Sequence, residues 1–335
     1  MLTRISGDTE IVRSHGDERV QVCRERWRLE GKVPLSLTRS TAPSGPVRPP
    51  LLLVHGFAQN RFTWHTSVRS FTAWMAHRGW DVWNLELRGH GESRLEGQSG
   101  ADRFHDYVDD VCAATRALPS APFLLGHSLG GAAVYGASTE LVGDRAPLGV
   151  LGLAAIYGFG KGNPLIRAAC EATHRLSQVP VLGSIQVRSR LLGRVMGKLY
   201  NVTDLAGYTV PLSGWWPGSV EPELLAERLE HGFDWTSLKV WQEMSRWASD
   251  GTFDYDDAWH TTDLPLFVGL GDKDHLLPPE DGRLAFTRSG SQDKTLVLFD
   301  DWHHGTHWGH LDIILGKDAP AQVWPTLHAW MAARS

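Results

Sequence analysis

The segment PFLLGHSLGGAAVYG (122–136) constrains the fold of this chain more than any other stretch. An apolar run leads into Gly-His-Ser-Leu-Gly, and a run of small residues follows. Gly126 and Gly130 stand two residues before and after Ser128, where a crowded turn leaves no room for side chains. Although the chain contains 35 glycines, this context favours a functional motif over a chance match. It predicts a buried strand, a sharp turn that presents Ser128 as a nucleophile, and a helix packed closely on a sheet.

The same alternation of strand and helix extends along both sides of this segment. Continuous apolar runs are typical of strands covered on both faces. Helices are expected between them at 67–79 and 102–118, and near the C-terminus at 279–289 and 319–333. Such alternation predicts an α/β fold with a doubly wound, mostly parallel sheet. The expected strands are 20–30, 33–40, 51–56, 81–89, 122–128, 148–160, 264–271 and 295–299.

The strand pattern stops in the middle of the chain. Residues 161–262 are therefore predicted to form a mostly helical cap, inserted into a core made of 1–160 and 263–335. Trp215 and Trp216 lie between glycines in LSGWWPGSVEP, which suits a lid loop, so we expect them to contact an apolar substrate. The other tryptophans of this region are expected mainly to pack the cap, and they are Trp235, Trp241, Trp247 and Trp259.

Composition narrows the class of protein. A net charge of −5 argues against a general nucleic-acid binder, whose phosphate contacts need a basic surface. No run of 18 uncharged apolar residues exists to span a membrane, and the first 20 residues lack the apolar region of a typical signal peptide. Cys23, Cys112 and Cys170 are widely spaced and odd in number, which favours reduced thiols in a cytoplasmic protein.

A serine nucleophile needs a base, and the base needs a carboxylate to orient it. In a parallel sheet both belong in loops at the carboxyl ends of strands. VGLGDKDHLLPP (268–279) places Asp272 and Asp274 directly after a predicted strand. We favour Asp274 as the carboxylate and keep Asp272 as the alternative, because Asp272 also fits a simple turn role.

The predicted base comes from the loop after the last strand, DDWHHGTHWGHLD. It contains His303, His304, His307 and His310. His310 is favoured because it precedes the apolar stretch LDIILG, followed in order by His307 and His304. The spacing of three between 304, 307 and 310 also leaves a metal site as a less favoured interpretation. The order Ser, Asp, His along the chain suits a serine hydrolase with this architecture.

Two backbone amides are expected to stabilise an oxyanion. One is that of Leu129, which follows the nucleophile at a helix N-terminus. The other is that of Phe57, after the strand LLLVHG. His55 and His127 are expected to have structural roles.

Several segments together resemble enzymes of the α/β-hydrolase fold: HGFAQNRFTW, DVWNLELRGHGESR, GHSLGG, GDKD and GHLDIILGKDAPAQVWPTLHAWM. GHLDIILGKDAP resembles the histidine region of acid (gastric-type) lipases, a similarity that implies His310 as the base. HGFAQNRFTWHTSVRSF resembles polyhydroxyalkanoate synthases. Those synthases carry cysteine where this chain has Ser128, which favours hydrolysis over polymerisation.

These features predict a serine carboxylester hydrolase that acts on a small, apolar ester. Ser128 would attack the carbonyl, His310 would take its proton, and Asp274 would orient the imidazole, with no metal or organic cofactor required. An acyltransferase or polyester-related enzyme with the same acyl-serine remains an alternative, as does a ligand-binding protein without turnover. A dehalogenase or epoxide hydrolase is disfavoured, because an aspartate would be expected at position 128.

Overall fold

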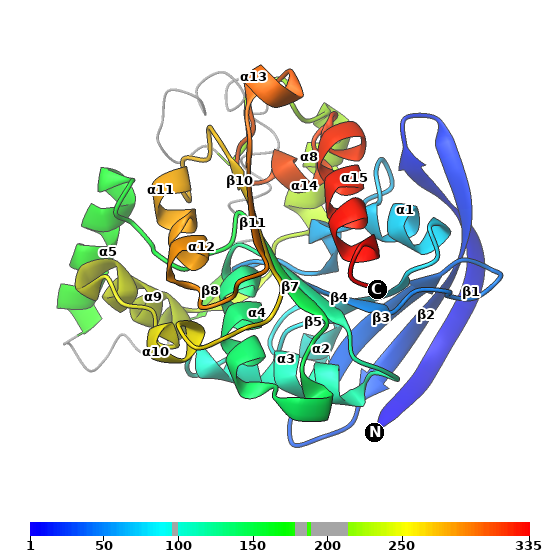
Figure 1. The fold of residues 1–335 in the computed structure, drawn as a ribbon, viewed down its shortest axis with the longest axis horizontal. Coiled ribbons are helices and arrows are strands. Elements are labelled where there is room, and N and C mark those ends of the chain that lie inside the picture. Colours follow the sequence, from blue (N-terminus) through cyan, green and yellow to red (C-terminus); the bar gives the residue numbers. More distant parts are fainter. Residues whose placement is uncertain (96–99, 178–185, 189–213) are drawn as a thin grey trace.

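A single large sheet forms the centre of the molecule (Figure 1). The computed structural model describes residues 1–95, 100–177, 186–188 and 214–335. Within them the sheet order is β1-β2-β3-β5-β4-β6-β7-β10-β11. The strands are β1 (Leu2–His15), β2 (Glu18–Leu29), β3 (Leu35–Thr41), β4 (Pro50–Val54), β5 (Asp81–Glu86), β6 (Phe123–His127), β7 (Gly149–Leu153), β10 (Leu266–Gly271) and β11 (Lys294–Phe299).

The strand directions confirm the predicted mostly parallel sheet. From β5 to β11 every neighbouring pair is parallel, whereas β1, β2 and β3 form an antiparallel extension that joins β5. All residues of β4, β6, β7 and β10 are buried, as their continuous apolar sequences predict. The carboxyl ends of these strands therefore meet at one edge, where the loops with the candidate functional residues begin.

Helices cover both faces of the sheet (Figure 1). Alternate residues of β4 show this division, because Leu52 packs into one core and Leu53 into the other. The first core includes α3 (His105–Ala117) and α4 (Leu129–Glu140), and the second includes α1 (Phe71–His77) and α15 (Ala319–Ala332). The remaining core helices are the short α2 (Gly91–Leu95), α11 (Pro279–Gly282), α12 (Leu284–Arg288), α13 (Asp301–His304) and α14 (Asp312–Leu315).

Two strand predictions differ from the structure. Residues Leu2–His15 form β1, which the sequence did not predict, and it pairs with β2 as the outer strand of the sheet, with half of its side chains exposed. The strand expected at 148–160 ends at Leu153, where Ala154 adopts a positive φ of 43° and turns the chain out of the sheet.

The described part of residues 161–262 is mostly helical, with α5 (Pro164–Ser177), α8 (Pro222–His231), α9 (Leu238–Asp250) and α10 (Asp256–Trp259). One short antiparallel pair joins β8 (Gln186–Arg188) to β9 (Trp235–Ser237). Helices α5 and α9 pack against each other beside the sheet, and α10 contacts α4 (Figure 1).

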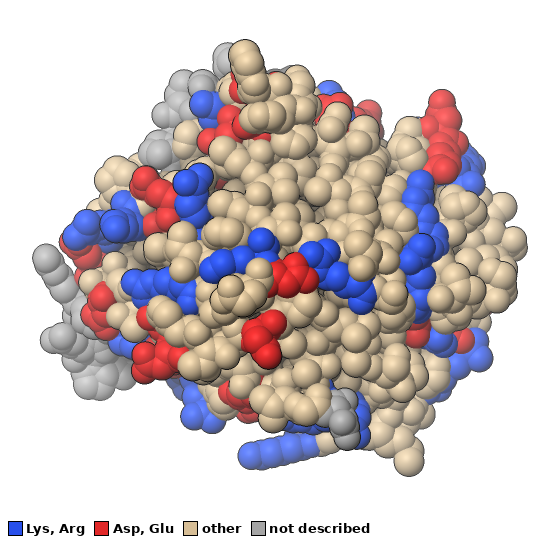
Figure 2. Space-filling view, in the orientation of Figure 1, with Lys and Arg blue, Asp and Glu red and all other residues tan. Residues whose placement is uncertain are grey.

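Three further observations concern the class of protein: the absence of membrane-spanning helices among the described residues, the state of the cysteines and the surface charge. None of the described helices combines the length and apolar character needed to cross a bilayer. The three cysteines are unpaired. On the face drawn in Figure 2, acidic and basic side chains are interspersed and do not form one continuous basic patch.

Candidate active site

Ser128 occupies a strained turn between β6 and α4. Its φ of 55° and ψ of −123° lie in a region that non-glycine residues rarely adopt. A Cβ at Gly126 would lie 2.3 Å from the carbonyl oxygen of Gly130, and a Cβ at Gly130 would lie 2.3 Å from that of His55. Because backbone atoms cannot yield at such distances, the turn requires glycine on both sides of Ser128.

His310 and Asp274 form a buried pair beside this turn. His310 follows β11 and Asp274 follows β10, and the imidazole Nδ1–H donates to Asp274 Oδ2 at 2.7 Å. The other carboxylate oxygen accepts the amides of Leu276 at 2.9 Å and Leu277 at 2.7 Å. The carboxylate is therefore fixed, and the tautomer with Nδ1–H leaves Nε2 of His310 available as a base.

The other histidines of the loop have separate partners. His307 Nδ1–H donates to Asp272 Oδ2 at 2.6 Å, and its Nε2 lies 3.6 Å from Asp301 Oδ2. His304 Nδ1 accepts the amide of Asp300 at 3.2 Å. A metal site formed by these side chains would require their imidazoles to converge on one point. The imidazoles of 304, 307 and 310 do not converge, because each has its own partner.

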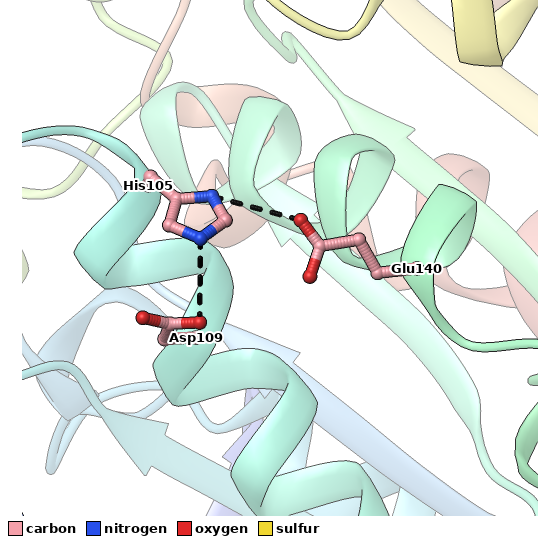
Figure 3. A group of neighbouring side chains, drawn as sticks. All are labelled: His105, Asp109 and Glu140. Carbon is pink, nitrogen blue, oxygen red and sulfur yellow. Dashed lines mark ion pairs between the residues drawn. The ribbon is translucent and has the colours of Figure 1, made fainter.

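Two described clusters bring metal-ligating atoms close together. Asp272, Asp301 and His307 form one of them, at the loop just described. Figure 3 shows the other, in which His105 lies between Asp109 at 3.5 Å and Glu140 at 3.6 Å. The His105 ring also hydrogen-bonds the Tyr255 hydroxyl. Since this second network ties α3 to α4 and to the segment before α10, ion pairing and helix packing account for it.

The two predicted oxyanion amides flank Ser128. Leu129 N–H is the first amide of α4 and has no partner within the helix. Phe57 lies in a turn closed by a 3.2 Å hydrogen bond from Gln59 N–H to Gly56 O. A Cβ at Gly56 would lie 3.0 Å from Ser128 Cβ, so this turn rests directly on the nucleophile's turn.

His55 and His127 support these loops, as predicted. His55 Nδ1–H donates to Gly56 O at 2.9 Å and Nε2 accepts Leu87 N–H at 3.1 Å, while burial lowers its pKa to about 3. His127 Nε2–H donates to the carbonyl of His310 at 2.9 Å. Both imidazoles are thus neutral cross-links between the loops that surround Ser128.

A cavity of about 270 Å³ opens beside Ser128 and His310. Its described lining is apolar except for these two residues and Gln59. Among its walls the Trp241 ring lies 6.0 Å from the ring of Phe57 and 5.9 Å from that of Phe159. Helix α5 contributes Ile166 and helix α9 contributes Trp241 and Met244. An apolar chain is the chemistry that fits this enclosure.

Trp215 and Trp216 do not belong to the described lining of the cavity. Trp215 is buried in the second core, and a Cβ at Gly309 would lie 2.8 Å from its Cα. The Trp216 ring packs 4.4 Å from that of His307, and its amide donates to Asp312 Oδ2 at 3.1 Å. Both tryptophans buttress the loop that carries His310.

Sequence reasoning missed most of the cavity lining, including Trp241 and Gln59. Trp241 lies in α9, and its apolar spacing with Val240, Met244 and Trp247 is a signal for an inward-facing stripe. Gln59 offers no such periodic signal, because it lies in a turn.

Helix α8 links the turn after β4 to the loop that carries His310. At its C-terminal end Phe233 forms a β-bridge with Gln59, and Asp234 N–H donates to Ala58 O at 2.7 Å. Within the helix, Arg228 Nη1–H donates to Leu311 O at 3.2 Å. This arrangement connects the turn of the oxyanion amides to the loop of His310.

Two buried ionisable side chains lie under the histidine loop. Asp312 accepts the amides of Gly309 at 2.8 Å and Trp216 at 3.1 Å, and desolvation raises its pKa to about 6. Burial lowers the pKa of the Arg228 guanidinium to about 10, while the negative charge of Asp312 opposes that shift.

Comparisons with known proteins show to which proteins this chain is similar. The alpha/beta hydrolase family model matches residues 51–323. A monoacylglycerol lipase of Mycolicibacterium smegmatis is 26% identical over 278 residues, which cover 80% of this chain and 83% of that protein.

Solved structures share the fold. The monoacylglycerol lipase of Paleococcus ferrophilus matches with a TM-score of 0.63 and 17% identity, over 90% of this chain and 99% of the other. An esterase of Thermogutta terrifontis matches with a TM-score of 0.56 and 16% identity, over 92% and 98%. Because the family model covers most of the chain, including Ser128, Asp274 and His310, this protein belongs to the alpha/beta hydrolase family.

Proposed function

We propose that this esterase- or lipase-like hydrolase cleaves apolar carboxylic esters through an acyl-enzyme on Ser128. The observation that carries the proposal is that Ser128 and His310 open into the same apolar cavity. His310 is at the same time hydrogen-bonded to a buried carboxylate. A serine on a strained turn, a base oriented by an aspartate and two nearby amides are the parts that acyl transfer requires.

In the proposed reaction His310 Nε2 removes the proton of Ser128 Oγ as the oxygen attacks the ester carbonyl. The amides of Phe57 and Leu129 donate hydrogen bonds to the oxyanion, and Asp274 stabilises the imidazolium. The imidazolium then gives its proton to the departing alkoxide, which leaves as the alcohol. A water molecule, deprotonated by His310, attacks the acyl-enzyme. The imidazolium then returns this proton to Ser128 Oγ as the bond to the acyl carbon breaks, which releases the carboxylic acid and restores the enzyme.

We further propose that residues 161–262 act as a cap that encloses the acyl chain. Ile166, Trp241 and Met244 come from this segment, and they support the proposal because they line the cavity beside Ser128. The monoacylglycerol lipases among the similar proteins favour a single-chain ester as the substrate. The similarity of residues 309–320 to acid lipases supports His310 as the base, and the unpaired cysteines support a cytoplasmic location.

A panel of 4-nitrophenyl esters with acyl groups of two to sixteen carbons tests the proposal. Activity should rise with acyl length until the cavity is filled, and Ser128→Ala should lower kcat on the order of 10⁶-fold. A Ser128→Ala protein that keeps more than about a tenth of the activity would contradict the assignment, because the residual catalysis of an oxyanion hole is far smaller. Adding alcohol acceptors and measuring ester products separates hydrolysis from acyl transfer.

A further inference from the structure

Gln59 is a polar side chain in the apolar cavity that the proposed chemistry does not use. It is 5% exposed, and besides Ser128 and His310 it is the one polar residue in the described lining. It belongs to the same turn as Phe57, whose amide is a proposed oxyanion donor. A buried carboxamide beside a reacting carbon needs a partner, since unpaired buried polar groups are costly.

The orientation of this carboxamide is set by Thr63. The Thr63 hydroxyl, buried in the short 3₁₀ helix Arg61–Thr63, donates to Gln59 Oε1 at 2.7 Å. With the oxygen occupied, the free donors of the side chain are those on Nε2. No residue in the described part of the chain accepts a hydrogen bond from Gln59 Nε2. This atom is also not one of the side-chain nitrogens that lack both a partner and solvent-accessible surface. The amino group is therefore open to the cavity.

The chemistry of an ester restricts which substrate atom Gln59 can meet. The carbonyl oxygen has the amides of Phe57 and Leu129 as proposed donors, and a saturated acyl chain carries no acceptor. The remaining acceptors belong to the alcohol portion: the ester oxygen, which every ester has, and the hydroxyl groups that only some alcohols carry.

We infer that Gln59 Nε2–H donates a hydrogen bond to a hydroxyl oxygen of the substrate's alcohol portion, so that the enzyme selects monoesters of polyols over simple alkyl esters. This inference rests on the proposed function and adds the alcohol to it. When a simple alkyl ester is bound, the amino group of Gln59 is removed from water without gaining a hydrogen bond. A polyol ester supplies the acceptor, so its kcat/KM should be higher than that of the alkyl ester.

Two esters that differ only in hydroxyl groups provide the test. The probes are 1-monooctanoylglycerol and propyl octanoate, and the measured quantity is the ratio of their kcat/KM values. Gln59→Met keeps the length and apolar volume of the side chain but removes the donor. We expect this variant to lower the glycerol-to-propyl ratio roughly tenfold, the size of one neutral hydrogen bond.

Thr63→Val supplies a second variant if Gln59→Met does not fold. It removes the hydroxyl that orients the carboxamide but retains the side-chain shape, and it should lower the same ratio in the same direction by a smaller factor. Gln292→Met is the matched control, because Gln292 is exposed on the surface and should leave both the ratio and the activity unchanged.

The outcomes separate this inference from the proposed function. A selective loss for the glycerol ester in either variant supports the role of Gln59. An equal loss for both esters, or an unchanged ratio, would overturn it and leave the esterase assignment intact. If the wild-type protein cleaves neither ester, or if Ser128→Ala cleaves them as fast as the wild type, the proposed function itself is wrong.

Discussion

His307 donates a hydrogen bond from Nδ1 to Asp272 Oδ2 at 2.6 Å, beside the 2.7 Å pair of His310 and Asp274. Both pairs connect the loop after β11 to the loop after β10. Asp272 also accepts the amide of Trp308 at 2.9 Å through Oδ1. Of the two imidazoles, His310 lines the cavity beside Ser128, while His307 packs against Trp216. The pair of His307 and Asp272 thus holds the loop, and the pair of His310 and Asp274 faces the cavity in which we propose that the reaction occurs.

Replacing each histidine tests this division of roles. His310→Ala should lower kcat by on the order of 10⁴-fold or more, because Ser128 loses its base. His307→Ala should cost less than about tenfold, because the loop keeps its other contacts with the sheet edge. Steady-state kinetics on one ester measures both, with the exposed His303→Ala as the control. An inactive His307→Ala together with an active His310→Ala would reverse the assignment.

Most of the sheet could be predicted from the sequence because buried parallel strands are continuous apolar runs. Strand β1 could not, because it lies at the outer edge of the sheet and only Val12 and Ser14 of its side chains are buried. Its sequence therefore carries little of the alternation that marks a half-buried strand.

The candidate site was predictable in part for a related reason. Ser128, Asp274 and His310 each follow a recognisable strand, so their meeting at one sheet edge follows from topology. The cavity wall does not follow from topology, because it depends on which face of a cap helix packs inward. Adjacent tryptophans between glycines suggested Trp215 and Trp216, yet tertiary packing places them under the histidine loop and puts Trp241 in the cavity.

The glycines around Ser128 give a prediction about folding. Gly130→Ala would place a Cβ 2.3 Å from the backbone oxygen of His55, so we expect a loss of at least about 1–3 kcal/mol in the free energy of unfolding. Urea unfolding and soluble yield measure this effect. Gly31→Ala is the matched control, because the nearest atom to its Cβ would be 3.8 Å away. Equal stability of the two variants would show that the turn tolerates more than its geometry indicates.

Asp312 predicts a specific dependence of stability on pH. Burial raises its folded-state pKa from 3.8 to about 6, so between these values the folded state binds the proton more tightly than the unfolded state. Ionisation of this group therefore lowers the free energy of unfolding as pH rises from about 4 to 6, by about 3 kcal/mol in total.

Asp312→Asn isolates this effect because asparagine has a similar shape and does not titrate. Urea unfolding at pH 4, 5, 6 and 7 should show the wild type losing stability relative to the variant across that window. A constant difference between the two proteins at all four values would contradict the raised pKa. The buried Arg228, whose pKa is influenced by the charge of Asp312, remains protonated throughout this range, since its pKa is about 10.

The final prediction concerns acyl length and compares two tryptophans. The Trp241 ring lies between Phe57 and Phe159, and its Nε1–H donates to Thr173 Oγ1 at 3.1 Å, which fixes the indole in the cavity wall. Trp241→Ala should enlarge the space for the acyl chain. Each additional buried methylene contributes at most about 0.8 kcal/mol, or about fourfold in kcat/KM. The preferred acyl group should therefore become several carbons longer in this variant, and short esters should be cleaved more slowly because they fill the cavity poorly.

Trp216→Ala is the matched control, because its ring packs on His307, outside the described lining. It should lower kcat for all chain lengths alike through the histidine loop, without moving the optimum. A shift of the optimum in Trp216→Ala but not in Trp241→Ala would instead place the lid loop, and not α9, against the acyl chain.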